Sequence, residues 1–513
     1  MQQQTTMMPD NCVAVIGAGP GGLAAAKWLS AHGLEPVVFE ASARLGGQWN
    51  SASATSAVWP GMRTNTSRIM TAFSDLDHAP GSATYLTQDE MLDYLERYAF
   101  VSGLLPKLRL STRVESLEPA AGGDGWLIRS ATGGRERSEV FRRVVVATGR
   151  CGTPSVPEIE GLSRFGGSLG AIHAAQYNGV ERYRGRHVLV AGCSISALEI
   201  ASELAYGGAR VTVASRRQRY VLPKLISGVP TEHVMFNRAA ALLGGVLPPP
   251  ELAAGLRAKV LAVAGNPAQF GAPAPDEDIF AAGVTQSQQF LPAVAEGRIA
   301  VMPWIEEIDG NRVLFRGGRR GAFDGIILGT GYRLSLPFLD AATAATLRLD
   351  DVHMDLHDQT FHPDLPGLAF LGLYDLVGPY LPVLELQARW ISYCFAGVVP
   401  MPSQAEMAEG VARAKAMRAG PPSLPMHVAA LGFARNAGVE PDLSARPDIE
   451  RALLFGPLSA VSFRLDGADT LPDATGRVQA AAAAFGAVTE LAFTGEELAI
   501  RGLVRRGALS SAA

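Results

Sequence analysis

The sequence is poor in cysteine, lacks a strong excess of either charge and contains no long hydrophobic run. Its 513 residues include four cysteines, and none of them forms a Cys-x-x-Cys pair. A disulfide framework and a dithiol redox centre are therefore not expected, and this usage suits a reducing cytoplasm. The net charge is −4 without a basic block, which argues against nucleic acid or an anionic membrane as a partner. No stretch approaches the roughly 20 consecutive apolar residues that a membrane span requires.

A complete nucleotide-binding β-α-β unit is predicted near the N-terminus. Residues 13–22 read VAVIGAGPGG, an apolar strand followed by glycines at Gly17, Gly19 and Gly22. The first glycine permits a tight turn, the second lets backbone N–H groups approach a pyrophosphate, and the third lets helix and strand pack closely. An amphipathic helix and a second strand then end on Glu40, whose carboxylate is expected to accept hydrogen bonds from a ribose hydroxyl.

The residues after this acid indicate which dinucleotide the first unit binds. The stretch ASARLGGQW (41–49) places an arginine and a Gly-Gly pair behind the acid. This arrangement resembles the extended FAD fingerprint of flavoproteins with two dinucleotide sites, and FAD is therefore predicted over NAD. The predicted FAD contacts in this stretch are Arg44, Gly47, Gln48 and Trp49.

A second β-α-β unit carries an altered glycine pattern. Residues 190–200 read VAGCSISALEI, in which Ser194 and Ala197 stand where the second and third glycines would follow Gly192. A serine side chain is small, and its hydroxyl can itself bond a phosphate, so the loop is still expected to hold a pyrophosphate. The predicted contacts here are Gly192, Ser194 and Ser196.

The end of the next strand distinguishes the second dinucleotide from the first. Ser215 occupies the place that corresponds to Glu40 in the first unit, and Arg216 and Arg217 follow it. A hydroxyl does not repel a 2′-phosphate, and guanidinium groups pair with phosphate through charge-assisted hydrogen bonds. The pattern therefore predicts NADPH, bound by Arg216 with support from Ser215 and Arg217.

Two further apolar strands predict how the units are connected. RRVVVATG (142–149) and FDGIILGTGY (323–332) both end in a Thr-Gly turn, as expected for segments that cross between two domains. Thr148 in the first turn is a predicted cofactor contact. The predicted fold class is α/β with two Rossmann-like dinucleotide-binding domains, the NADPH domain being inserted into a discontinuous FAD domain. The expected divisions are 1–160 and 326–513 for the FAD domain and 161–325 for the NADPH domain.

Five segments outside the glycine loops carry a further similarity. They contain a Thr-Asn element before a phenylalanine, a Phe-x-Gly…His-x-x-x-Tyr signature, a Thr-Gly-Tyr segment and two C-terminal stretches. These segments are residues 62–75, 165–177, 324–339, 365–390 and 453–467. With them, nearly the whole chain resembles the flavin-containing monooxygenases, which are class B flavoprotein monooxygenases. It departs from that family in the spacing within 167–173, at Ser194 and at Gly329, where alanine is usual.

The resemblance implies a monooxygenase that depends on FAD, NADPH and O₂. It implies that NADPH reduces FAD and that O₂ adds at flavin C4a, giving a hydroperoxide that oxygenates an amine nitrogen or a sulfide sulfur. By the same resemblance, the Asn65 amide lies over the flavin as the candidate catalytic group, although an asparagine there could instead cap a following helix. Tyr332 is expected to support the nicotinamide, and Gln387 to approach the flavin or to lie on a helix surface.

Other activities share this two-loop plan. A Baeyer–Villiger oxygenation of a ketone is suggested by Trp-Pro-Gly at 59–61, but the residues that follow differ and the linker signature ends in Tyr177. An uncoupled NADPH oxidase or a non-catalytic flavin-binding protein is a further alternative, because the Ser194 loop could hold NADPH weakly. A pyridine nucleotide–disulfide reductase lacks its cysteine pair here. No metal site is predicted; the expected partners are a small-molecule substrate and O₂, and a homodimer is compatible with the sequence.

Overall fold

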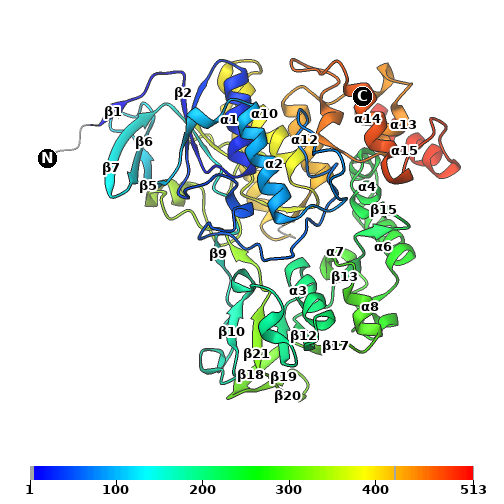
Figure 1. Ribbon diagram of the computed structural model, residues 1–513. Coiled ribbons are helices and arrows are strands. Elements are labelled where there is room, and N and C mark those ends of the chain that lie inside the picture. The colour runs from blue at the N-terminus through cyan, green and yellow to red at the C-terminus, as the bar shows by residue number, and fades with distance from the viewer. Residues whose placement is uncertain (1–4, 421–422, 512–513) are drawn as a thin grey trace.

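The structure, a computed structural model, describes residues 5–420 and 423–511 and contains two five-stranded parallel sheets. Figure 1 shows them in an upper and a lower region of the molecule. The upper sheet has the order β23 (Leu368–Phe370), β8 (Arg143–Val146), β2 (Cys12–Ile16), β3 (Glu35–Phe39) and β4 (Leu108–Arg109). Its neighbouring strands all run parallel, and they come from both ends of the chain. The first dinucleotide-binding domain is therefore discontinuous, as predicted.

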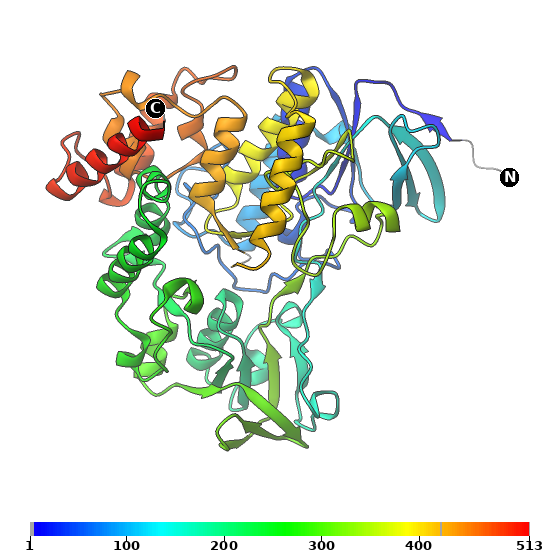
Figure 2. The ribbon, with the colours of Figure 1, turned by 180° about the vertical axis from the view of Figure 1, so that it is seen from behind.

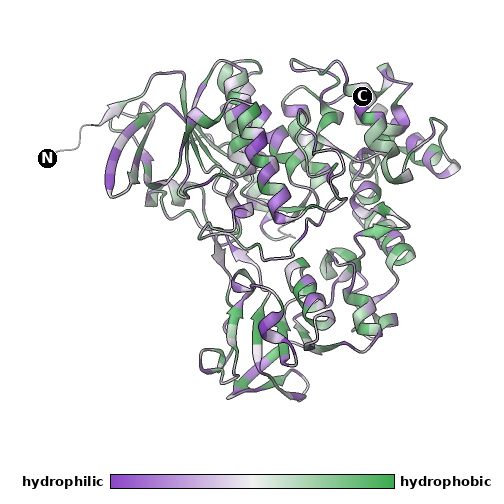
Figure 3. Ribbon diagram, viewed as in Figure 1, coloured by the Kyte–Doolittle hydropathy of each residue, from purple (hydrophilic) through white to green (hydrophobic). Residues whose placement is uncertain are grey.

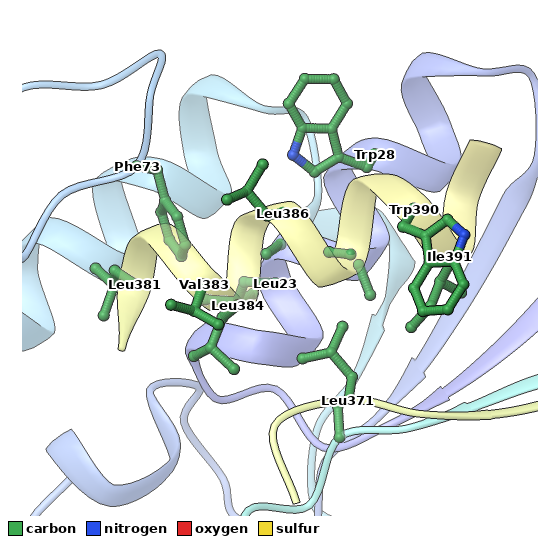
Figure 4. Packing of buried hydrophobic residues seen from close by; sticks show 14 of the residues in the cluster. Leu23, Trp28, Phe73, Leu371, Leu381, Val383, Leu384, Leu386, Trp390 and Ile391 are labelled. Atoms are coloured by element: carbon green, nitrogen blue, oxygen red, sulfur yellow. The ribbon is translucent and has the colours of Figure 1, made fainter. Parts of the chain in front are cut away.

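Two helices build the main apolar core above this sheet. Helix α1 (Pro20–Ala31) packs against the sheet and against α10 (Leu381–Ala396), which is buried along nearly its whole length. The alanines and glycines of α1 let the two helices approach closely, and burial of the larger side chains provides the hydrophobic driving force. Figure 4 shows the residues that meet there, among them Leu23, Trp28, Leu384, Leu386 and Trp390.

The lower sheet lies wholly within the segment between β8 and β23. Its order is β10 (Gly170–His173), β21 (Gly325–Leu328), β11 (His187–Ala191), β12 (Arg210–Ser215) and β17 (Ile299–Pro303), and all neighbours are parallel. Helix α3 (Ile195–Tyr206) makes the crossover from β11 to β12. The division expected between 325 and 326 falls inside β21, all four residues of which pair in this sheet. The chain therefore leaves the lower sheet only after Leu328.

Two short strands carry the chain between the upper and lower regions. β9 (Thr153–Pro154) leads down and β22 (Tyr332–Arg333) leads back, and the two pair antiparallel. His173 lies beside this ribbon, buried, with its Nε2 3.0 Å from Gly331 O and its Nδ1 accepting a hydrogen bond from Ala175 N–H. Both ring nitrogens are thus used to order the connection, so His173 has a structural role.

Short helices of the inserted segment also reach the C-terminal helices. Figures 1 and 2 both show α4 (Thr231–Met235) beside that region. Helix α5 (Arg238–Leu243) contacts three C-terminal helices, namely α12 (Met426–Asn436), α13 (Glu450–Phe455) and α15 (Gly495–Ser511). Arg238 is fully buried at this contact and pairs with Glu440 at 3.2 Å. The insert therefore meets the rest of the molecule at the C-terminal helices as well as at the connecting ribbon.

Smaller sheets flank the two parallel ones. Beside the upper sheet lie β1 (Thr6–Met7), β7 (Arg135–Phe141), β6 (Trp126–Thr132) and β5 (Thr112–Pro119), which form a four-stranded sheet. Beside the lower sheet lie β18 (Ile305–Asp309), β19 (Arg312–Phe315) and β20 (Arg320–Ala322), which form a three-stranded sheet. Figure 3 shows hydrophobic residues on the strands of the parallel sheets and hydrophilic ones on the outer elements. Among residues 5–420 and 423–511, none of the helices combines the length and apolar character that crossing a bilayer needs.

Candidate active site

The first glycine loop has the close packing that a phosphate-binding turn requires. Gly17 follows β2 with φ +107°, in the region that favours glycine. A Cβ on Gly22 would lie 1.8 Å from Gly17 O, so only glycine lets α1 begin this close to the strand. A Cβ on Gly47 would lie 2.8 Å from the Cα of Gly19. The Gly-Gly pair after Glu40 therefore packs directly on the glycine loop.

Helix α1 begins directly after this loop without a side-chain cap. Its N-cap residue, Gly19, offers no side-chain acceptor. In α2 (Gln88–Val101) and α11 (Gln404–Met417), by contrast, Thr87 and Ser403 accept hydrogen bonds from N–H groups of the first turn. Free N–H groups at a helix start, together with the helix dipole, form a binding site for phosphate. The residues present thus fit the pyrophosphate of FAD.

Glu40 lies beside the same loop, at the carboxyl end of β3. Its Oε2 accepts a hydrogen bond from Ala18 N–H at 2.8 Å, and its Oε1 accepts one from Ser42 N–H at 2.8 Å. These two bonds fix the orientation of the carboxylate. Since a carboxylate can accept about four hydrogen bonds, capacity remains for ribose hydroxyls. The geometry supports the ribose contact predicted for Glu40.

Three other predicted FAD contacts lie near this loop with different exposure. Gln48 is exposed and Trp49 is half-buried, both in the short 3-10 helix η1 (Gly47–Trp49). Thr148 is exposed at the end of β8, and its Cα would lie 3.2 Å from a Cβ on Gly17. The Thr-Gly turn after β8 therefore borders the glycine loop.

Arg44 has a partner of its own. Its Nε and Nη2 donate to the two carboxylate oxygens of Glu96 on α2, at 2.5 and 2.9 Å. Half of the Arg44 side chain is exposed to solvent. The guanidinium is thus engaged in a surface ion pair through its Nε and Nη2. The contact with FAD predicted for Arg44 stays a prediction.

The second glycine loop is built like the first, but it has an alanine at its third position and a glycine in the turn that faces it. Gly192 has φ +135°, and a Cβ there would lie 2.3 Å from Gly329 O. A Cβ on Gly329 would lie 2.6 Å from the Cβ of Ala197, the residue at the third glycine position. The methyl group and the Cα of Ala197 therefore occupy the space that an alanine at 329 would need, which explains the glycine at that position.

Helix α3 also begins without a side-chain cap. Its N-cap residue is Ser194, whose Oγ donates to Gly329 O at 3.4 Å instead of accepting from the first turn. Ser196 lies half-buried in that first turn. The N–H groups at the start of α3 therefore remain free for a second phosphate. Replacement of the middle glycine by Ser194 leaves this arrangement intact.

The end of β12 presents an unpaired guanidinium. Arg216 is exposed, stacks on Trp304 with its Cζ 4.9 Å from the ring centre, and has no ion-pair or hydrogen-bond partner within residues 5–420 and 423–511. Arg217 differs, because its Nη1 donates to Ala281 O at 2.7 Å. Ser215, the residue before them, is buried. Of the two arginines, Arg216 is therefore the better placed to pair with a 2′-phosphate.

Trp304 was not indicated by the sequence. It directly follows β17, and only the parallel pairing of β17 with β12 brings it next to Arg216. A tryptophan face stabilises a neighbouring guanidinium by a cation–π contact and limits its motion. The sequence signal, an aromatic residue after an apolar strand, becomes meaningful only once that strand pairing is known.

Asn65 lies in a loop and is half-buried. The next described helix, α2, begins at Gln88, so the alternative that Asn65 caps a following helix is wrong. Neighbouring side chains bond locally, since Thr64 Oγ1 donates to Thr66 O at 2.8 Å. The Asn65 amide itself has no hydrogen-bond partner in the described stretches of the chain. It therefore has both a donor and an acceptor to offer a ligand.

Gln387 is committed to the core. Its side chain on α10 is 0% exposed, and its Oε1 accepts from Gly372 N–H at 2.9 Å. Its Nε2 donates to Thr360 Oγ1 and Phe370 O at 2.9 and 3.0 Å. These bonds tie α10 to the end of β23. Both expectations for Gln387, a flavin contact and a helix-surface position, are wrong.

Tyr332 stands on the connecting ribbon. It is half-buried in β22 and packs edge to face on His173, with ring centres 5.2 Å apart. Burial raises the pKa of its phenol above the usual value, so the hydroxyl is protonated at neutral pH. The nicotinamide contact expected of Tyr332 stays a prediction.

The fold and the two loops together define the class of protein, namely a flavoprotein with separate sites for FAD and NADPH. One strand end carries the carboxylate of Glu40 and the other the unpaired guanidinium of Arg216. The chain belongs to the flavin-binding monooxygenase-like family, whose sequence model matches residues 10–481. This assignment confirms the predicted flavin monooxygenase class and its FAD and NADPH cofactors.

Individual relatives agree with this assignment. Dimethylaniline monooxygenase (N-oxide-forming) 2 of Rattus norvegicus is 30% identical over 481 residues, which cover 89% of this chain and 88% of that protein. Flavin-containing monooxygenase 5 of Oryctolagus cuniculus is 28% identical, with 89% of both chains covered.

Two solved structures support the fold alone. The S-allyl-L-cysteine S-oxygenase of Allium sativum is 23% identical with a TM-score of 0.60, covering 85% of this chain and 90% of that one. An NADP⁺-bound cyclohexanone monooxygenase from Rhodococcus is 17% identical with a TM-score of 0.64, covering 85% and 98%. The predicted fold class, with one nucleotide-binding domain inserted into another, is thereby confirmed.

Proposed function

We propose that this protein uses NADPH and O₂ to oxygenate a soft nucleophile, an amine nitrogen or a sulfide sulfur, in a small molecule. The observation that carries the proposal is the pair of glycine loops in a chain of this family, one beside Glu40 and the other beside the unpaired Arg216. The names of an N-oxide-forming relative and of a structurally similar S-oxygenase support the same class of substrate.

The work assigned to the chain's own residues is binding, orientation and exclusion of water. FAD and NADPH, when bound, supply the reducing equivalents and the activation of O₂. The N–H groups at the starts of α1 and α3 hold the two pyrophosphates, Glu40 accepts hydrogen bonds from ribose hydroxyls, and Arg216 pairs with the 2′-phosphate. Asn65 offers its amide to the reacting region from the neighbouring loop. With the residues and cofactors in these roles, the protein needs no acid–base dyad.

A product survey tests the function directly. The FAD-loaded enzyme is incubated with NADPH and a panel of amines, sulfides and ketones, and the products are analysed by mass spectrometry while NADPH consumption and peroxide release are recorded. An amine or sulfide that gains one oxygen for each NADPH consumed is expected. Conversion of ketones to esters alone would replace the proposal by a Baeyer–Villiger activity. Release of all the consumed equivalents as peroxide would identify an NADPH oxidase.

The role proposed for Asn65 is tested by Asn65→Ala. Removing the amide is expected to lower the yield of oxygenated product per NADPH by about tenfold or more, since a lost donor at a reacting centre typically costs 10²–10³ in rate. NADPH oxidation should continue, with peroxide as its product. Asn311→Ala, at the exposed turn between β18 and β19, is the matched control and should behave as the wild type. An unchanged product yield in Asn65→Ala would remove this residue from the proposal.

The setting of the enzyme is inferred from its composition. Four scattered cysteines and a net charge of −4 favour a cytoplasmic enzyme that acts on small molecules without nucleic-acid or membrane partners. We propose a homodimer as its assembly. Light scattering coupled to gel filtration measures the subunit number, and a monomer mass near 54 kDa would contradict the dimer.

A further inference from the structure

The loop that contains Asn65 is bonded to the inserted domain. Ser67 N–H donates to Glu232 Oε1 at 2.5 Å, and Ser67 Oγ lies 3.0 Å from His233 Nε2. Both partners belong to α4, which is more than 160 residues later in the chain. Ser67 is completely buried, two residues after Asn65. The backbone that carries the candidate catalytic amide is therefore fixed by side chains of the other domain.

These two side chains are unusual for their degree of burial. Glu232 and His233 are each 1% exposed. Burial raises the pKa of Glu232 and lowers that of His233 to about 4. Glu232 Oε2 and His233 Nδ1 have no hydrogen-bond partner among the residues that the structure describes. Polar atoms buried without partners cost stability, so this cost is carried for the bonds that the same two side chains make to Ser67.

Two more bonds join the same stretch of chain to the insert. Upstream of Asn65, Trp59 Nε1 donates to Glu203 Oε2 on α3 at 2.7 Å. Downstream, Tyr85 Oη donates to Lys224 O at 2.6 Å. The Asn65 loop is therefore tied to the insert on both sides, and Glu203 lies on the helix whose first turn is proposed to hold NADPH.

At Ser74, the loop is held by a comparable bond within the FAD domain. Ser74 N–H donates to Glu385 Oε2 at 2.7 Å, and Ser74 Oγ donates to Glu385 Oε1. Glu385 lies on α10 and is 2% exposed. The segment from Ser67 to Ser74 is thus held by one buried glutamate from each domain, and only the glutamate of the insert is adjacent to Asn65.

We propose that Glu232 and His233 are positioning residues that, through Ser67, hold the Asn65 amide in place, so that oxygen transfer depends on contact between the insert and this loop. The inference rests on the proposed function, because it assigns Asn65 to the reacting region. It explains why two polar side chains are buried at the domain contact. When the contact is loosened, NADPH is still consumed but less of it yields oxygenated product.

Substitutions of Glu232 and its partners test the proposal. Glu232→Leu removes the acceptor for Ser67 N–H and is expected to reduce product per NADPH by about tenfold, as for a displaced reacting group. Glu232→Gln retains a carbonyl oxygen and should restore the ratio to within about twofold of the wild type. His233→Phe and Ser67→Ala remove the bond between Ser67 Oγ and His233 but keep the Ser67 N–H bond to Glu232, so they should have smaller effects that do not add in the double variant. If Glu232→Leu does not fold, His233→Phe and Ser67→Ala still test the proposal.

Glu385→Leu is the matched control. It removes the same kind of bond from the same loop, but at Ser74 and within the FAD domain. We expect it to lower the midpoint of thermal unfolding and to leave the ratio of product to NADPH unchanged. Equal losses of that ratio in Glu232→Leu and Glu385→Leu would overturn the proposal, because loop stability alone would then explain both.

Hydrogen exchange gives a readout that does not depend on activity. Amides in residues 62–72 should exchange faster in Glu232→Leu than in the wild type, with or without FAD and NADP⁺, while the rest of the FAD domain is unchanged. Faster exchange with an unchanged product ratio would overturn the positioning role. If the wild type itself oxygenates none of the compounds tested, the proposed function fails, and unchanged exchange in 62–72 would then overturn the contact proposal separately.

Discussion

At the scale of single residues, the arginines after β12 show why sequence position alone does not assign a role. Arg216 and Arg217 are adjacent, exposed and identical in chemistry. The structure commits Arg217 to Ala281 O and leaves Arg216 stacked on Trp304 without an anionic partner. A guanidinium has five N–H donors, and Arg217 already uses one of them for Ala281 O, so Arg216 has more to offer a phosphate.

Arg216→Ala is therefore expected to reduce the preference for NADPH over NADH. Loss of a charge-assisted bond to the 2′-phosphate costs about 1.5–3 kcal/mol, which corresponds to an increase in KM for NADPH of roughly 10- to 100-fold. KM for NADH should change little, because NADH has no phosphate at that position. Arg217→Ala is the control and should have a smaller effect. Steady-state kinetics with both nucleotides measures this preference. An unchanged NADPH preference in Arg216→Ala would refute the assignment of Arg216 to the 2′-phosphate.

His233 makes stability depend on pH. Burial lowers its pKa to about 4 in the folded chain, whereas an exposed histidine has a pKa near 6.5. Below pH 6.5 the unfolded chain therefore binds a proton that the folded chain resists, and stability falls until about pH 4. The loss is on the order of 3 kcal/mol for a shift of this size.

His233→Gln should remove this component. Thermal unfolding midpoints are compared between pH 7 and pH 4 for the wild type and the variant. The raised pKa of Glu232 acts in the opposite direction, but it is present in both proteins and cancels in the comparison. The wild type should lose more stability on acidification than His233→Gln. Parallel curves would show that His233 does not titrate as its burial indicates.

At the scale of elements, the two glycine loops solve one packing problem in two ways. In the first, glycine at 22 allows α1 to begin against the oxygen of Gly17. In the second, Ala197 retains a methyl group, and the opposing Thr-Gly turn has lost one at Gly329. In each unit, a residue without a Cβ thus gives the helix room beside the neighbouring backbone.

Gly329→Ala is expected to disturb the docking of α3. The new Cβ would lie 2.6 Å from that of Ala197, and overpacking of this kind costs about 1–3 kcal/mol. Ala197→Gly removes the nearest of these contacts and leaves the Cα of residue 197 at 2.9 Å from the new Cβ, so the two substitutions should be less damaging together than the sum of their separate effects. Thermal unfolding and NADP⁺ binding measure this coupling. Additive losses of stability and NADP⁺ binding would show that residues 197 and 329 do not compete for the same space.

At the scale of the whole molecule, the insert is held by the connecting ribbon, by its bonds to the Asn65 loop and by its contact with the C-terminal helices. At that contact Arg238 is fully buried, lies 5.1 Å from the ring centre of Phe463 and pairs with Glu440. Burial lowers the pKa of Arg238 to about 10, and its Nε and Nη2 have no partner in the described part of the chain. The charge is therefore tolerated because of Glu440, which links the insert to the C-terminal segment of the FAD domain.

Glu440→Gln should destabilise the protein because it leaves a buried cation without its counter-charge. The expected loss is about 3 kcal/mol, at the lower end for a broken buried pair because Glu440 is partly exposed. Arg238→Met in the same chain removes the cation and should recover most of this loss. Denaturant unfolding of the two single variants and the double variant gives the coupling. An unchanged free energy of unfolding in Glu440→Gln would show that the Arg238–Glu440 pair does not hold the insert.

Much of the fold was predictable because its signals are local. The glycine spacing, the apolar runs and the acid or arginine at the strand ends all lie within about thirty residues of one another in each unit. Turn geometry, helix packing and phosphate binding impose these residues one unit at a time. The ribose contact of Glu40 and the choice of dinucleotide could be argued from them without knowing the rest of the chain.

The sequence by itself thus determined two nucleotide-binding units, their order and the ligand that each favours. Only the tertiary structure decided that Arg44 pairs with Glu96, that Gln387 is enclosed in the core and that Ser67 meets Glu232. These contacts join residues far apart in the chain, and they depend on the register of strands and the docking of one domain on the other. No local pattern encodes such contacts, because their free energy arises from burial and partners that exist only after the chain has folded.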